Sequence, residues 1–178
     1  MTARPLTASD LERHLRDRHV DAVLLHLPVL TPTVEQAARA VGTSTDDIVK
    51  SLLFLVDGRA VVAITCGLGR VDARALAARF SVGRKRVKLA EPEVVLMTTG
   101  FPVGGLPPFG HRRALPTLID RRVLARSLVY AGGGSDRALV RITPQELLRA
   151  TQGEIVDLSQ LPSDEVELGR DPAATQEG

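Results

Sequence analysis

The stretch SLLFLVDGRAVVAIT, residues 51–65, contains two apolar runs separated by Asp57 and Gly58. Val, Ile, Phe and Thr are common in strands. An Asp-Gly pair between two such runs favours a type I′ turn, in which both central residues have positive φ. The stretch therefore predicts a β-hairpin that pairs Ser51–Val56 with Arg59–Thr65.

Helix and strand patterns alternate on both sides of this hairpin. Leu11 and Leu15 lie four residues apart in a helix expected over 7–19, with Ser9 as its cap. Thr33-Val-Glu-Gln36 is a capping-box pattern, and Gly42 suits the end of that helix. Further helices are expected over 72–80, 92–97 and from Thr143 onward, and strands over 20–27, 127–131, 138–142 and 155–158. The pattern predicts an α+β fold, a single domain with a mixed, largely antiparallel, curved sheet and surrounding helices.

The length of 178 residues suits one hydrophobic core. Aromatic residues are only 3% of the chain, so we expect a core of Leu, Val, Ile and Ala. We assign residues 1–30 to the same domain as a core over 31–161, and expect residues 162–178 to form a disordered acidic tail. Residues 163–178 hold one Arg against five acidic residues, so residues 1–162 carry a net charge of +6.

Several functional classes are disfavoured by composition. Cys66 is the single cysteine and the four histidines show no metal-ligand spacing, so we expect no metal and no other cofactor. The scarcity of aromatic residues disfavours single-strand binding by stacking. The first 30 residues have no uninterrupted apolar run, so we expect no signal peptide, no membrane partner and a cytoplasmic location.

Basic residues gather in two stretches of the folded part. Such stretches can bind the phosphates of a nucleic acid, or they can be ordinary solvent-exposed surface. Composition alone does not favour one interpretation over the other. The candidates for phosphate contacts are Arg84, Lys85, Arg86 and Lys88 in the first stretch and Arg112 and Arg113 in the second.

Two further features can carry chemistry. Lys50 enters the first hairpin strand between apolar neighbours, where a lysine either extends to solvent or directs an ammonium into a cleft. The segment 100–111 has four Gly and three Pro, and the free amides of such a loop can surround an oxyanion. Gly132–Ser135 offers a weaker version of the same feature. The segment 100–105 matches neither a Walker A nor a dinucleotide-binding motif.

The motifs taken together resemble the YbaK/EbsC family of aminoacyl-tRNA deacylases, relatives of the editing domain of prolyl-tRNA synthetases. The resemblance covers about residues 30–160, and it implies hydrolysis of the ester between a wrong amino acid and tRNA, without a cofactor, on a mixed α+β fold. The motifs that carry it are Lys50-Ser-Leu-Leu, Gly100-xxx-Gly104-Gly105, Pro107-Pro-Phe-Gly-His111, Leu115-Pro-Thr-Leu-Ile-Asp120, Val129-Tyr-Ala-Gly-Gly133 and Thr143-Pro-Gln-Glu-Leu147.

The resemblance also implies roles for individual residues. The catalytic set is Lys50, which would hold the aminoacyl-adenosine end, with Gly100, Gly104 and Gly105; the substrate-binding set is Phe101, Pro102, His111, Gly132, Gly133 and Ser135. The basic residues named above become candidates for tRNA binding, and the implied partners are aminoacyl-tRNA and an aminoacyl-tRNA synthetase.

One loop departs from the family pattern. Some relatives have a histidine or a Lys/Arg-Gly pair where this chain has Gly-Gly-Gly-Ser-Asp over 132–136. An alternative hypothesis is therefore a non-catalytic tRNA-binding, RNA-binding or regulatory module on the same fold.

Overall fold

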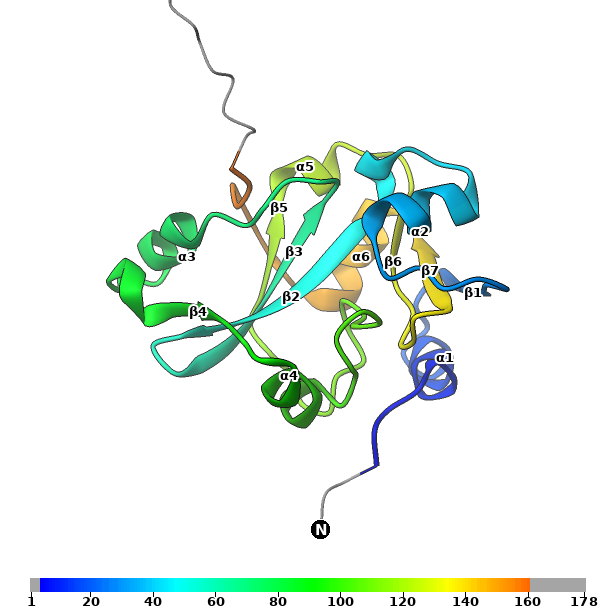
Figure 1. The fold of residues 1–178 in the computed structure, drawn as a ribbon, viewed down its shortest axis with the longest axis horizontal. Helices are drawn as coiled ribbons and strands as arrows, with labels where there is room; N and C mark the ends of the chain where they lie inside the picture. The colour runs from blue at the N-terminus through cyan, green and yellow to red at the C-terminus, as the bar shows by residue number, and fades with distance from the viewer. Residues whose placement is uncertain (1–3, 161–178) are drawn as a thin grey trace, which may run out of the picture.

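The computed structural model describes residues 4–160, and Figure 1 shows how helices surround two sheets. The helices are α1 (Ala8–Asp17), α2 (Val34–Val41), α3 (Ala73–Arg79), α4 (Pro92–Thr99), α5 (Arg121–Leu124) and α6 (Pro144–Thr151), with short 3-10 helices η1 (Thr45–Asp47) and η2 (Arg84–Arg86). The strands are β1 (Ala22–His26), β2 (Val49–Val56), β3 (Arg59–Cys66), β4 (Val87–Leu89), β5 (Thr117–Asp120), β6 (Val129–Gly132), β7 (Ala138–Ile142) and β8 (Glu154–Val156).

The strands form a five-stranded sheet in the order β4-β2-β3-β5-β8 and a three-stranded sheet in the order β1-β7-β6. Pairing is parallel for β3–β5 and β5–β8, and antiparallel for the four other strand pairs. An isolated parallel bridge between Ile48 and Tyr130 joins the two sheets. The prediction of an α+β fold with mixed, largely antiparallel pairing is confirmed. The strands are divided between two sheets, whereas we expected a single sheet.

The predicted hairpin is confirmed. β2 and β3 pair from Val56↔Arg59 to Val49↔Cys66, so both strands extend slightly beyond the predicted bounds. Asp57 and Gly58 have φ of 50° and 78°, the positive values that a type I′ turn requires. The hairpin is the longest paired unit of the described residues, and it forms the centre of the larger sheet.

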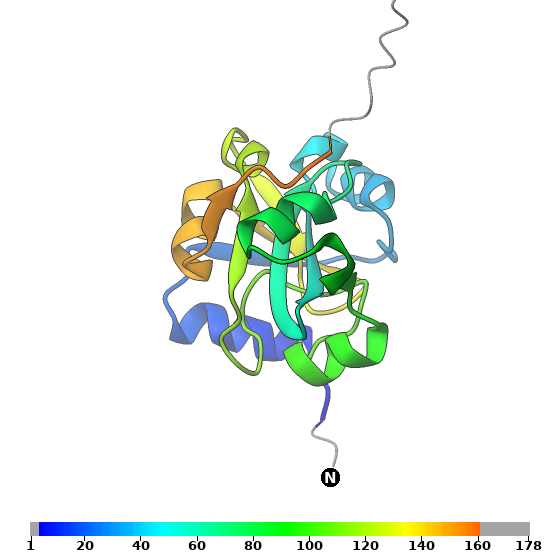
Figure 2. The same ribbon diagram turned by 90° about the vertical axis from the view of Figure 1, so that its left-hand side faces the viewer.

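The two faces of this hairpin pack against different parts of the core. Leu53 and Ile64 lie in one apolar cluster together with Leu11 of α1. Phe54 and Ala63 lie in another cluster together with Leu76 of α3. Because alternate residues of a strand point to opposite faces, each strand contributes to both clusters. The turned view shows α3 in front of the sheet and α1 along its lower side (Figure 2).

The cap of α1 differs from our expectation of Ser9, which is wrong. Thr7 is the cap residue: it has extended backbone, and its hydroxyl accepts a hydrogen bond from the Asp10 amide. The Asp10 carboxylate in turn accepts from the Thr7 amide at 2.9 Å. Ser9 lies inside the helix, because Thr7 with an acidic residue three positions later completes the reciprocal capping box.

Leu11 and Leu15 of α1 lie in the main apolar cluster, together with residues of both sheets. The expected disordered tail over 162–178 lies outside the described residues. Within residues 4–160, no helix is long and apolar enough to cross a bilayer.

Glu146 links the N-terminal segment to α6. Its carboxylate accepts from the Asp21 amide at 2.9 Å and from Arg149 Nε at 2.7 Å. Arg149 Nη2 also donates to His19 O at 3.0 Å. The Arg149 guanidinium lowers the pKa of Glu146 to about 2, and the Asp21 amide acts in the same direction.

This link predicts a pH-dependent contribution to stability. Because its pKa is lowered in the folded state, Glu146 stabilises the fold above its ordinary pKa of about 4.5, and this contribution is lost as the pH falls toward about 2. We expect Glu146→Gln to lower the free energy of unfolding by about 1 kcal/mol at neutral pH. Urea titrations across the acid range should show this difference shrinking.

The matched control is Glu12→Gln on the exposed side of α1, which should leave the free energy of unfolding within about 0.5 kcal/mol of the native protein. A difference for Glu146→Gln that stayed constant down to about pH 2 would contradict the proposed link.

Candidate functional site

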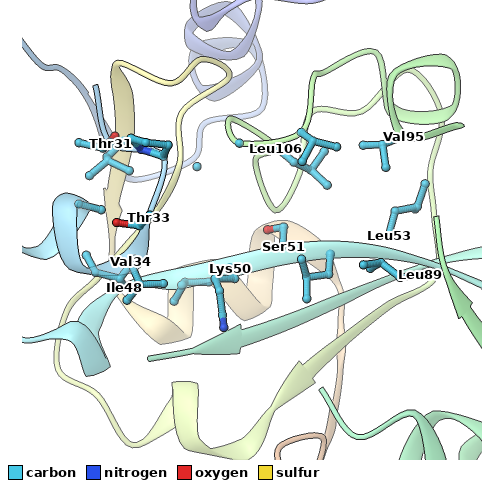
Figure 3. A pocket seen from close by; sticks show the side chains of 18 of the residues that line it. Thr31, Thr33, Val34, Ile48, Lys50, Ser51, Leu53, Leu89, Val95 and Leu106 are labelled. Carbon is cyan, nitrogen blue, oxygen red and sulfur yellow. The ribbon is translucent and has the colours of Figure 1, made fainter. Parts of the chain in front are cut away.

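A cavity of about 290 Å³ lies between β2, α2, the start of α4 and the loop that follows α4. Figure 3 shows Leu106 and Val95 facing β2 across this cavity, with Val34 and Ile48 at its α2 end. Its lining is mostly aliphatic, and the polar side chains among the described lining residues are those of Thr31, Thr33, Lys50 and Ser51.

The cavity exists because one edge of β2 is only partly paired. β3 pairs with β2 along its whole length, whereas β4 pairs only with Phe54–Val56. Leu53 O accepts from the Ala90 amide on the β4 side at 2.9 Å. Because strand backbone groups alternate in direction, the N–H and C=O of Ser51 point to this same edge. The cavity is therefore bounded by backbone groups that no strand of the described chain pairs with.

Two glycine-containing loops close the other side of the cavity. A Cβ at Gly132 would overlap with the Leu106 carbonyl oxygen, and a Cβ at Gly105 would lie 2.6 Å from the Ser135 amide nitrogen. The Gly134 amide donates to Gly105 O at 2.8 Å. The loops therefore touch backbone to backbone, which only glycine allows at these positions.

The segment after α4 is irregular, as its Gly and Pro content predicted. Gly100 ends α4 in the left-handed conformation, and its amide donates to Leu96 O at 2.9 Å. The Gly105 amide donates to Pro102 O at 3.3 Å. Gly104 lines the cavity, and within residues 4–160 no backbone acceptor takes its amide. Of the predicted catalytic glycines, Gly104 is thus the one at the cavity, while Gly100 and Gly105 fix the path of the loop.

Lys50 lines the cavity with its stem, but its ammonium lies on the opposite face of β2. Nζ donates to Gly69 O at 2.8 Å, and Figure 3 shows it directed away from Leu106. Burial lowers the pKa of the Lys50 ammonium; the charges of Arg122 and Arg70 act in the same direction, and those of Cys66 and Glu35 oppose them. Lys50 is half-buried, and its ammonium is bound on the far face of β2, outside the cavity interior.

Arg122 also lies next to Gly69. Its Nη2 lies 3.0 Å from where a Cβ of Gly69 would stand. The carboxylate of buried Asp120 caps α5 by accepting from the Arg122 amide at 2.8 Å, and it also forms an ion pair with Arg122 Nε at 3.4 Å. The two cations therefore flank one short turn, which holds positive charge at this end of β2.

Phe101 and His111 were predicted to bind substrate, but the structure places both side chains outside the cavity lining. Phe101 is fully buried and contacts the His111 ring edge-on at 6.5 Å. His111 Nε2 is 2.8 Å from Pro107 O, and burial lowers the pKa of its ring. Both side chains pack within the loop over 100–111, away from the cavity. Pro102 is exposed and also outside the lining.

In the second glycine loop, too, only some of the predicted residues line the cavity. Gly132 lines the cavity. The Gly133 amide donates to Ala138 O at 2.9 Å, and Ser135 Oγ accepts from the Arg137 amide at 3.2 Å. Gly133 and Ser135 therefore shape the turn between β6 and β7 and do not face the cavity.

The predicted tRNA-binding residues are all exposed, and they lie away from Lys50. Lys88 pairs with Leu55 in the sheet, five residues along β2 from Lys50, or roughly 17 Å at the usual strand rise. Arg86 forms an ion pair with Asp57, and Arg84 Nη1 donates to Val87 O at 3.3 Å. In the second stretch, Arg112 donates to Arg4 O while Arg113 extends from the neighbouring loop position.

Residues 4–160 contain no group of three or more His, Cys, Asp or Glu that could hold a metal ion. Cys66 is buried, and burial raises the pKa of its thiol. Sequence reasoning missed Thr31, Thr33 and Ser51 as lining residues. Ser51 follows Lys50 on a predicted strand, and successive side chains of a strand point to opposite faces. The sequence could therefore have predicted that Ser51 and Lys50 point in opposite directions.

The described residues thus form a mixed α+β domain with a small, mostly aliphatic cavity at the partly paired edge of β2, and with the Lys50 ammonium on the other face of that strand. The profile of the family described as "Aminoacyl-tRNA editing domain" matches residues 29–150. The chain belongs to this family, and the family supports a tRNA-editing role.

Individual relatives agree with this assignment. The chain is 32% identical over 116 residues to the "Uncharacterized protein YwhH" of Bacillus subtilis, covering 65% of this chain and 72% of that one. It is 24% identical over 128 residues to the "Putative Cys-tRNA(Pro)/Cys-tRNA(Cys) deacylase EbsC" of Enterococcus faecalis, covering 71% and 77%. The crystal structure of "a putative trans-editing enzyme for prolyl tRNA synthetase" superposes with a TM-score of 0.79 at 36% identity, covering 86% and 96%. The resemblance to the YbaK/EbsC family is confirmed.

The backbone contact between the glycine loops predicts a strong effect of Gly132→Ala. The new methyl group would overlap with Leu106 O, so one loop must move. We expect the free energy of unfolding, measured by urea titration, to fall by about 1–3 kcal/mol. Gly83→Ala is the control, because nothing lies within 4 Å of a Cβ there and its φ is negative. Equal midpoints for Gly132→Ala and Gly83→Ala would show that the loops do not touch as described.

Proposed function

We propose that this chain is a trans-editing deacylase that hydrolyses the ester between a mischarged amino acid and tRNA. The observation that carries this proposal is the cavity of about 290 Å³ with Gly104 and Gly132 in one wall and β2 in the other. This volume is at the lower end of the range for small-molecule sites, so it suits one amino acid side chain. Synthetases reject small amino acids poorly by binding alone, and a second hydrolytic site corrects the errors.

The groups at the cavity suit ester hydrolysis without a dedicated side-chain base. A water molecule or the vicinal hydroxyl of the terminal ribose would attack the ester carbonyl. The charge that develops on the carbonyl oxygen would be stabilised by backbone amides, for which Gly104 is the best placed. One such donor is worth about 3–4 kcal/mol in other hydrolases.

Lys50 suits the adenosine end of the substrate. With the acyl group in the cavity, the ribose and phosphate would pass the open edge of β2 and reach the face on which Nζ donates to Gly69 O. An ammonium at this position attracts phosphate as a compact point charge. Exposed Arg84, Lys85, Arg86 and Lys88, about 17 Å further along β2, would contact the acceptor stem. The substrate would be met in the cytoplasm, where charged tRNA and its synthetases occur.

Deacylation of a panel of mischarged tRNAs tests the proposal. We expect loss of the ester with at least one of them, and a decrease in kcat/KM of at least about 100-fold for Lys50→Ala. Lys50→Arg should also fail, since a planar guanidinium does not replace a compact ammonium. The free energy of unfolding of Lys50→Ala should change by about 1 kcal/mol or less, because one half-exposed hydrogen bond is removed.

Arg74→Ala, which removes one positive charge from the exposed side of α3, is the control and should keep full activity. Tight binding of tRNA with no hydrolysis of any mischarged form would favour the non-catalytic module instead. Full activity of Lys50→Ala would remove Lys50 from the site.

The basic stretch on η2 and β4 predicts a salt effect. If Arg84, Lys85, Arg86 and Lys88 bind tRNA phosphates, replacing all four with Ala should flatten the slope of log K against log salt by roughly 0.7–0.9 for each phosphate that is no longer neutralised. Hydrolysis of a minimal aminoacyl-adenosine should hardly change, because that substrate reaches only the cavity and Lys50. Equal slopes for the native and substituted proteins would assign this stretch to a solvated surface and leave Arg112 and Arg113 as the remaining candidates.

A further inference from the structure

The Ser51 hydroxyl is a buried polar group at the cavity without a hydrogen-bond partner in the described chain. Ser51 is 9% exposed, and its Oγ is shielded from solvent. It lines the cavity, and Figure 3 shows the hydroxyl directed from β2 toward the side on which Leu106 lies, opposite to Lys50. A buried hydroxyl loses its hydrogen bonds to water, so an unpartnered one is unfavourable in the empty protein.

The other lining hydroxyls are already engaged. Thr31 Oγ1 donates to Asp136 O at 3.2 Å, and Thr33 Oγ1 lies 3.0 Å from Gln36 Oε1 and caps α2. The Lys50 ammonium donates to Gly69 O on the other face. Among the polar side chains of residues 4–160 that line the cavity, Ser51 is therefore the one that a bound group can satisfy.

The surroundings of Ser51 determine which chemistry can satisfy it. Leu53, Val95 and Leu106 line the same cavity, and none of its described lining residues is Asp or Glu. A charged group beside Ser51 would lose its hydration without gaining a counter-ion. A neutral hydroxyl can both donate to Oγ and accept from it, whereas a thiol is a weak partner and a methyl group is none.

We propose that Ser51 determines specificity and selects acyl groups with a small side-chain hydroxyl, those of serine and threonine, over apolar groups of the same size. This inference rests on the proposed function, since it assigns the substrate class of the same cavity. Threonine and valine have nearly the same shape, so a purely apolar cavity separates them poorly. An apolar side chain leaves the Ser51 hydroxyl buried without a hydrogen-bond partner, whereas a side-chain hydroxyl forms a hydrogen bond with it.

Paired substrates and one variant test this assignment. The native protein should deacylate threonyl-tRNA about 10- to 100-fold faster than valyl-tRNA by kcat/KM on the same tRNA, and seryl-tRNA faster than alanyl-tRNA. For Ser51→Ala, the threonine-to-valine ratio should fall at least tenfold, mainly through loss of threonine activity. The thermal midpoint of ligand-free Ser51→Ala should stay equal or rise, because an unpartnered buried hydroxyl is removed.

Thr65→Val is the matched control. Thr65 is fully buried and its hydroxyl is also unpartnered within residues 4–160, but it lies on β3 outside the cavity lining. Its removal should leave the threonine-to-valine ratio unchanged. A ratio near one for the native protein, or an equal fall in both activities for Ser51→Ala, would overturn the assignment.

Binding of stable analogues separates this inference from the proposed function. Threonyl and valyl groups joined to the 3′ position of adenosine by an amide would be titrated by calorimetry. A threonyl preference that Ser51→Ala abolishes, in a protein that hydrolyses no ester, would support the role of Ser51 and contradict the deacylase. Ester hydrolysis without a preference for the threonyl analogue would support the deacylase and contradict the role of Ser51. Failure to bind either analogue would contradict both proposals.

Discussion

The backbone contact between the two glycine-containing loops is the constraint on which the cavity depends. Gly132 faces the Leu106 carbonyl and Gly105 faces the Ser135 backbone, each with no room for a side chain. The Gly134 amide then fixes the contact by donating to Gly105 O. Because one loop follows β6 of the small sheet and the other precedes β5 of the large sheet, this contact links the two sheets in addition to the bridge between Ile48 and Tyr130. A side chain at either position would push the loops apart and change the wall that carries Gly104.

The opposite wall depends on the incomplete pairing of β2. β4 reaches only Phe54–Val56, so the edge beside Ser51 has no strand of the described chain on the cavity side. An exposed strand edge is normally protected, because its free amides and carbonyls can pair with another chain. Here α2, α4 and the loop after α4 surround it. The same strand directs Ser51 toward the cavity and the Lys50 ammonium to the other face (Figure 3), so the cavity and the cation lie on opposite sides of β2.

Local patterns predicted much of this fold. The Asp57-Gly58 turn, the cap at Thr33 and the irregular loop after Thr99 follow from short-range rules, and each is confirmed. β5 (Thr117–Asp120) was missed as a strand, because its parallel partners β3 and β8 are distant in sequence and its four residues show no alternation. The site was harder to predict, since a motif gives the order of residues and not the direction of side chains. Phe101 is buried behind its loop, while Ser51 was overlooked beside Lys50.

The position of the acyl group is the point on which the proposed chemistry depends. A crystal structure with a non-hydrolysable 3′-aminoacyl-amide of 5′-phosphoadenosine would locate it directly. We expect the aminoacyl side chain between Ser51 and Leu106, its carbonyl oxygen near the Gly104 amide, and the phosphate on the Lys50 side of β2. An analogue bound elsewhere on the protein, with the cavity unchanged, would contradict the assignment of this cavity as the editing site.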